Sequence, residues 1–146
     1  MNISILLLCA TLGHSAETKV KLTDLPPAAQ KTITEKSQGA KLKHILKDTS
    51  KDAPTFEAEM SVAGMEKSVT VDANGNIVEL DETVALSALP ARAQGAIMKA
   101  AEGGGKIRKV ESISHGGPVE FYEALMKKAG KKSIIRVDPE GKPVAD

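Results

Sequence analysis

The sequence predicts an α+β fold in which two tandem helix-plus-antiparallel-sheet repeats pack into one compact body. Three observations support this fold class. The segment "LPPAAQKTI" from Leu25 recurs as "LPARAQGAI" from Leu89, 64 residues later. The segment "FEAEM" from Phe56 recurs as "YEALM" from Tyr122, 66 residues later. In both copies the apolar spacing changes from a helical period to a strand-like alternation. The repeats span residues 22–80 and 86–144.

Each repeat begins with a helix. Apolar residues recur on one helical face: Leu25, Ala29 and Ile33 in the first copy, and Leu89, Ala93 and Ile97 in the second. Thr23 or Asp24 is the candidate N-cap of the first helix, and Ser87 is that of the second, with proline close behind in each case. Gly39 and the glycine run at 103–105 end the two helices.

A small antiparallel sheet follows each helix. Strands are expected over 41–47 and 106–113, and again over 68–71 and 133–137. Between them, Phe56, Ala58, Met60 and Val62 alternate with polar residues, as in a strand with one buried face. We expect residues Asp81–Ala85 to connect the repeats. One unit of about 60 residues is marginally stable alone, so the two units are expected to share a core, and their sheets can be continuous.

The stretches "VDANGNIV" (Val71–Val78) and "VDPEGKPV" (Val137–Val144) occupy equivalent places in the two repeats. Aspartate at the start of a turn and glycine three residues later suit a hairpin turn with a left-handed last residue. A calcium loop of the EF-hand type is disfavoured, because Gly75 stands at the fourth loop position and not at the sixth. Both stretches are therefore interpreted as turns.

The N-terminal segment resembles a secretory signal peptide. Residues 1–16 carry no Asp, Glu, Lys or Arg, and a short apolar run from Ile3 to Leu12 precedes the small residues Ser15 and Ala16. The run is too short to span a bilayer. We predict cleavage near Ala16 and a periplasmic or secreted protein. The alternatives are a buried N-terminal strand, a misplaced start codon, or lipidation at Cys9, the only cysteine.

Composition argues against several functions. The chain has 20 Lys+Arg against 19 Asp+Glu, so no large field would steer it to nucleic acid. Its only aromatic residues are Phe56, Phe121 and Tyr122, which leaves no platform for stacking bases. His44 and His115 lie near no cysteine and no patterned carboxylates, and we interpret them as surface histidines. We therefore expect no cofactor, no metal site and no catalytic residues.

One difference between the repeats points to a partner-binding surface. On the outer face of the alternating strand, Thr55 and Glu59 of the first copy become Phe121 and Leu125 in the second. Either the other repeat covers this apolar pair, or the pair forms a docking patch. In the second case Tyr122 and Lys127 would form its rim. The candidate partner-binding residues are thus Phe121, Tyr122, Leu125 and Lys127.

A run of lysines follows directly: Lys127, Lys128, Lys131 and Lys132. At a hairpin tip, these residues would attract anionic lipid head groups or polyanions. On an exposed sheet edge, they would instead discourage the pairing of another strand. The sequence favours edge protection.

The repeated motifs resemble a PepSY-like domain. The resemblance rests on "LPPAAQKTI", "KLKHI" and "FEAEM…AG…VTVDANGNIVE", and on the matching segments of the second copy. The tandem arrangement is similar to the fold of the β-lactamase inhibitor protein. The resemblance implies an exported, non-enzymatic protein that binds or modulates a peptidase or another envelope protein. The alternative is a sensor that binds a small ligand or lipid head group between the two repeats. The oligomeric state is not predicted.

Overall fold

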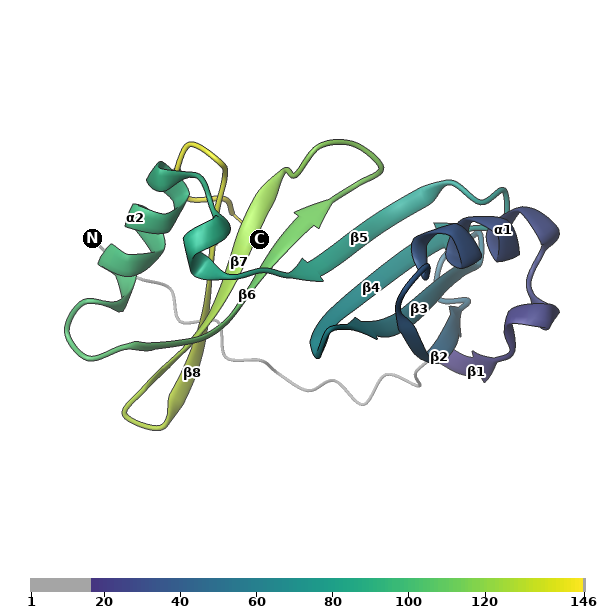
Figure 1. The fold of residues 1–146 in the computed structure, drawn as a ribbon, viewed down its shortest axis with the longest axis horizontal. Coiled ribbons are helices and arrows are strands. Elements are labelled where there is room, and N and C mark those ends of the chain that lie inside the picture. Colours follow the sequence, from purple (N-terminus) through teal and green to yellow (C-terminus); the bar gives the residue numbers. More distant parts are fainter. Residues whose placement is uncertain (1–16, 146) are drawn as a thin grey trace.

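The computed structural model describes residues 17–145 and places all eight strands in one antiparallel sheet, in which each strand pairs with the next along the chain (Figure 1). The two predicted sheets are therefore continuous. The predicted signal peptide and Cys9 lie outside the described residues. The strands are β1 (Glu17–Val20), β2 (Lys41–Asp48), β3 (Thr55–Val62), β4 (Met65–Asp72), β5 (Ile77–Thr83), β6 (Lys106–Ser114), β7 (Phe121–Lys128) and β8 (Lys131–Val137).

Two α-helices occur within the described part of the chain, α1 (Pro27–Lys36) and α2 (Ala91–Ala101). They lie at opposite ends of the molecule (Figure 1). Ala29, Ile33, Ala93 and Ile97 are buried on the inner faces of the helices, which confirms the helical spacing there. Leu25 and Leu89 are also buried but lie just before the helices, in extended backbone. No helix within residues 17–145 is long and apolar enough to cross a membrane.

The predicted N-caps are wrong. The cap positions are occupied by Pro26 and Pro90, neither of which provides a side-chain cap. Thr23 and Asp24 lie instead in a preceding 3-10 turn, η1 (Leu22–Asp24), and Ser87 lies in the equivalent turn, η2 (Leu86–Ala88). The fixed φ of proline suits the entry into a helix, so the polar residues are displaced one turn upstream.

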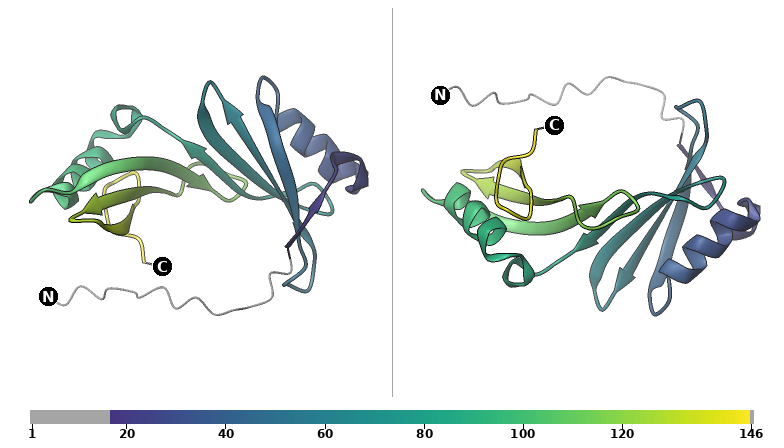
Figure 2. Two further views of the ribbon diagram at one scale, coloured as in Figure 1. Left: turned by 90° about the horizontal axis from the view of Figure 1, so that it is seen from below. Right: turned by 90° about the horizontal axis from the view of Figure 1, so that it is seen from above.

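Both helices pack on the same face of the sheet. Leu80 of β5 packs with the α1 core, and in the β5–β6 register it lies opposite Ser114. Val110 of β6 belongs to the α2 core. Because side chains alternate along a strand, Ser114 and Val110 share one face. We call it the helix face, and the opposite side of the sheet the open face. The views in Figure 2 show each helix against its own part of the sheet.

The expected shared core is not formed. One hydrophobic cluster lies beneath α1 and includes Phe56, Met60 and Val69, and a second lies beneath α2 and includes Tyr122 and Val137. The two halves meet edge to edge through the pairing of β5 with β6, and not face to face. Each half therefore buries its apolar residues under its own helix.

The two glycine turns have the predicted geometry. Asp72 Oδ1 accepts the backbone amides of Asn74 and Asn76 at 2.8 and 2.9 Å, and Gly75 has a φ of 79°. In the second turn Asp138 Oδ1 accepts the amide of Lys142 at 2.8 Å. The glycines also have a second role, because each turn lies against a helix. A Cβ added to Gly75 would lie 2.6 Å from the carbonyl oxygen of Ala28.

The predicted connector begins too early. Asp81–Thr83 form the end of β5 and pair with Glu111–Ile113 of β6. The acidic residues made this segment resemble a loop, because Leu80 is the only large apolar residue in the part of β5 that pairs with β6. Asp81 therefore lies in the middle of the sheet, on its open face.

Candidate functional site

The open face is rich in carboxylates, and no helix among the described residues covers it. Its acidic residues come from five consecutive strands, β3 to β7: Glu57, Glu59, Glu66, Glu79, Asp81, Glu111 and Glu123. Alternation explains the grouping, because these positions carry the polar half of each strand while Ala58, Val69 and Val110 fill the helix face.

A groove of about 250 Å³ crosses this face where the two halves meet. Apart from Met60 its lining is polar and charged, with residues from β2 to β6. Lys43 and Glu57 contribute from the first half, Lys109 and Glu111 contribute from the second, and Asp81 lies on the strand at the junction. The groove is therefore a shared feature of both halves.

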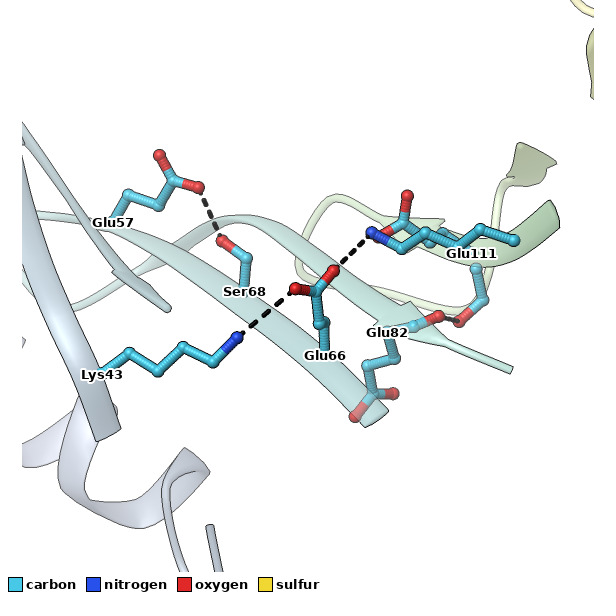
Figure 3. Close-up of polar contacts among 8 residues, drawn as sticks. Lys43, Glu57, Glu66, Ser68, Glu82 and Glu111 are labelled. Atoms are coloured by element: carbon cyan, nitrogen blue, oxygen red, sulfur yellow. Dashed lines mark hydrogen bonds and ion pairs between the residues drawn. The ribbon is translucent and has the colours of Figure 1, made fainter. Parts of the chain in front are cut away.

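A chain of ion pairs bridges the groove. Glu66 contacts Lys43 at 3.3 Å and Lys109 at 2.8 Å, and Lys109 also contacts Glu111 at 2.8 Å. Figure 3 shows Glu66 between Lys43 on one side and Glu111 on the other. The hydrogen bond from Lys109, reinforced by Lys43, holds the pKa of the Glu66 carboxyl below its ordinary value. Lys43 and Lys109 are thus already paired, and Lys67, the third lysine of the lining, is paired with Glu82 at 2.8 Å.

Asp81 has no such partner. Its Oδ1 atom is buried and accepts no hydrogen bond from the described residues. The hydroxyl oxygen of Thr83, two residues further on the same face, is likewise buried and unpaired. Burial, together with the charges of Glu79, Glu111, Glu57 and other carboxylates, raises the pKa of Asp81 to about 7. The site therefore holds an ionisable oxygen that receives no hydrogen bond from the described part of the chain.

The two predicted surface histidines are paired with carboxylates. His115 follows β6, and its two ring nitrogens lie 3.3 Å from Glu79 and 3.0 Å from Glu120. The hydrogen bond with Glu120 is the main cause of the raised pKa of His115. His44 lies 3.4 Å from Glu59 on the open face. The contact of His115 with Glu79 attaches the loop after β6 to β5, and the contact of His44 with Glu59 joins β2 to β3.

The predicted docking patch is only partly assembled. Phe121 and Leu125 share the open face and are both half-buried, but they are four residues apart on β7, with Glu123 between them. The Phe121 ring has the guanidinium of Arg136 above it, 6.0 Å from its centroid. Tyr122 does not lie at the rim of this patch. It points to the helix face and is 9% exposed, because side chains alternate along β7 and Phe121 faces the other way. Lys127 is exposed near the hairpin tip.

The residues 17–145 contain no group of three or more His, Cys, Asp or Glu side chains placed to hold a metal ion. In the first glycine turn, the carboxylate of Asp72 is engaged by Asn74 and Asn76, and the hydrogen bond from the Asn76 side chain is the main cause of its lowered pKa. The carboxylate oxygens of Asp72 are thus used within the turn itself, in agreement with the interpretation of this stretch as a hairpin turn.

The sequence interpretation missed Asp81. The only available signal was Leu80 between Glu79 and Asp81, and the polar residues that follow favoured a connector. The groove itself depends on the register between β5 and β6, which no local pattern reveals.

The sequence matches no protein-family model and no curated protein. Solved structures do resemble the fold. A BLIP-like protein from Bacteroides fragilis is 18% identical, with 83% of this chain and 84% of that chain covered and a TM-score of 0.62. A second similar structure is that of a protein from Bacteroides eggerthii whose name describes it as periplasmic. It is 16% identical, with 83% of this chain and 86% of that chain covered and a TM-score of 0.65.

A protein of the DUF2874 family from Bacteroides uniformis is 17% identical, with 82% of this chain and 86% of that chain covered and a TM-score of 0.63. Identities this low establish likeness of fold and nothing about activity. The chain therefore has an α+β fold of the BLIP-like type, in which an eight-stranded antiparallel sheet carries two helices on one face.

Proposed function

We propose that this chain is an exported, non-enzymatic binding protein whose open face engages another exported or envelope protein. The observation that carries the proposal is Asp81, a carboxylate held half-buried at the junction with an oxygen to which no residue of the range 17–145 donates a hydrogen bond. A buried charge without a partner costs stability. Groups that cost stability in a free protein are commonly found at sites that serve binding.

The chemistry of the groove favours a basic partner residue. Lys43 and Lys109 are already paired with Glu66, so neither neutralises Asp81 in the geometry observed. An arginine or lysine of a partner would supply the missing donor and face the surrounding carboxylates. A charged hydrogen bond of this kind typically contributes about 1.5–3 kcal/mol. Phe121 and Leu125, further along the open face, would supply apolar contact.

The proposal includes export and the absence of catalysis. Export rests on the signal-like character of residues 1–16, which we expect to be cleaved near Ala16. The periplasmic name given to the similar protein of Bacteroides eggerthii agrees with this location. The carboxylate pairing of His44 and His115 supports a structural role for both histidines.

We also propose that the chain arose by duplication of a PepSY-like unit, with repeats at residues 22–80 and 86–144. The equivalent turns support this origin. Gly75 and Gly141 both have φ of 79°, and a Cβ on either would meet a helix carbonyl oxygen within 2.6 Å. Ala63 and Ala129 share an unusual positive φ, of 50° and 48°.

The alternative function is a sensor for a small ligand between the two repeats. The groove favours it by position, because both halves contribute to its lining. Its volume of about 250 Å³ is smaller than most drug-sized ligand sites, and its lining is charged, so the ligand would be a small amine or guanidine. A melting temperature raised by such compounds, without any protein partner, would favour this alternative.

The experiment is site-specific photo-crosslinking in the native host. A photoreactive residue replaces Thr70, which lies between Glu57 and Glu79 on the open face. The matched control places it at Lys31, an exposed position on α1. We expect one discrete crosslinked protein from position 70 and none of that size from position 31. Equal crosslinking from both positions, or none from position 70, would contradict the proposed surface.

A further inference from the structure

The end of the β7–β8 hairpin concentrates positive charge, independently of the open-face groove. In the strand register Lys127 lies opposite Lys132, and Lys128 lies opposite Lys131. Lys106 of β6 lies on the other side of Lys127, which extends the row to three strands. Like charges placed directly opposite one another destabilise a sheet. The fold therefore tolerates a repulsion at this tip that its own residues do not relieve.

The tip also has a hollow. A cavity of about 280 Å³ is lined by Lys106, Arg108 and Lys127, with Gly104, Ala129 and Gly130. Neither these three cations nor Lys128, Lys131 and Lys132 form an ion pair with any residue in the described range 17–145. The space beside the turn is thus large enough for one phosphate-sized group among unpaired cations.

Hairpin geometry does not require the lysines. The β3–β4 hairpin has the same Ala-Gly turn, with φ of 50° and 83° at Ala63 and Gly64 against 48° and 81° at Ala129 and Gly130. Its flanking register pairs are Ser61 with Glu66 and Val62 with Met65, so they carry no like charges. The same turn therefore forms without cross-strand lysine pairs.

Edge protection explains only part of the cluster. Lys131 and Lys132 lie on β8, which is the last strand of the sheet, and lysines there do discourage strand addition. Lys127 and Lys128 lie on β7, which is paired on both sides by β6 and β8. Lys127 lies between Lys106 and Lys132 in the register and protects no edge, whereas Lys128 pairs only with Lys131. The edge interpretation favoured by the sequence leaves Lys127 unexplained.

We propose that this tip binds the surface of an anionic phospholipid membrane, with a lipid phosphate in the hollow. Lys127 and Lys132 point to the open face, and Lys128 and Lys131 point to the helix face. The cations therefore lie on both faces of the hairpin end, so that a flat anionic surface approached by this end would meet all four. On the open face Ile134 is 53% exposed next to the lysine row, which offers apolar contact at the level of the head groups.

The test is co-sedimentation with phosphatidylcholine vesicles, prepared with and without phosphatidylglycerol. The test variant carries Lys→Gln at 127, 128, 131 and 132, and the control carries Lys→Gln at 19, 21, 31 and 51, which are exposed in the first half and give the same net charge. All proteins are produced from the full-length chain and purified in the form that the host yields. Binding to neutral vesicles is subtracted, so that only the charge-dependent part is compared.

We expect the wild type and the control to bind phosphatidylglycerol vesicles in a salt-sensitive manner. Each lysine near an anionic surface contributes roughly fivefold, so the four together would contribute about 600-fold if all reached the surface. We expect the test variant to bind at least about 25-fold more weakly, the loss that two of the four lysines would cause. The test variant should melt no lower than the wild type, because the opposed lysines are gone. If it fails to fold, the double variant at 127 and 132 takes its place. Equal binding by wild type and test variant would overturn the proposal, as would wild-type binding to a soluble polyanion such as heparin without binding to the vesicles.

Discussion

Replacing Asp81 by asparagine should stabilise the protein, and the gain should depend on pH. Asparagine has nearly the same shape as aspartate and carries no charge. Asp81 is half-buried with an unpaired Oδ1, and its pKa in the folded protein is raised from 3.8 to about 7. In the unfolded chain the same carboxyl ionises near its ordinary value. Asp81→Asn therefore removes a charge that the folded state resists more strongly than the unfolded state does.

The sign follows from proton linkage. Between about pH 4 and pH 7 the unfolded chain releases the Asp81 proton while the folded protein retains it, so ionisation lowers the stability of the wild type progressively over this window. The difference from 3.8 to about 7 corresponds to about 4 kcal/mol for a fully shielded group. Because Asp81 retains access to water, we expect about 1–2 kcal/mol after solvent screening.

Urea unfolding of the wild type and of Asp81→Asn, at pH values from 4 to 8, measures this effect. The stabilisation by asparagine should rise through the window and reach its plateau above about pH 7. Glu35→Gln on α1 is the control, since its side chain is exposed, and it should shift the midpoint little at any pH. A destabilised Asp81→Asn at pH 8, or a pH-independent effect, would refute the reasoning.

Two further predictions concern the turns and the loop after β6. Gly75→Ala should cost about 1–3 kcal/mol more stability than Gly39→Ala. Both glycines have left-handed φ (79° and 74°), but only at Gly75 would the new Cβ lie against Ala28, 2.6 Å from its carbonyl oxygen. Equal thermal midpoints of the two variants would contradict this contact. Glu120→Gln should lower the raised pKa of His115, which an NMR titration of the ring measures, and an unchanged value would show that Glu120 is not the main cause. The His115 ion pairs stabilise the loop below the histidine pKa, and this contribution is lost as the pH rises through it.

Local patterns predicted much of the fold. The helical spacing placed Ile33 and Ile97 in the interior, where both are fully buried. The alternation of the segment beginning at Phe56 identified β3 and its buried face. The glycine turns at Gly75 and Gly141 were predicted from aspartate and glycine at the turn spacing, because aspartate caps such a turn and glycine accepts its left-handed φ. These successes share one cause: each depends on residues within a few positions of one another.

The candidate site could not be predicted from local patterns, because it depends on the register between strands that are far apart in the sequence. Asp81 and Glu111 are 30 positions apart, and only the pairing of β5 with β6 places both at one groove. The side of Tyr122 was misjudged although alternation alone places it opposite Phe121; the strand begins at Phe121, and its first residue faces outward. The β1 strand was not predicted either, since the segment from Glu17 to Val20 carries only one large apolar residue.

The most direct measurement of the binding proposal compares photo-crosslinking from position 70 in the wild-type background and in Asp81→Asn. Since asparagine should leave the fold intact and more stable, a loss of crosslinking cannot arise from unfolding. If a basic residue of the partner pairs with Asp81, the yield of the crosslinked partner should fall at least about tenfold at limiting partner concentration, as the loss of a charged hydrogen bond predicts. An unchanged yield would contradict the role of Asp81 in binding.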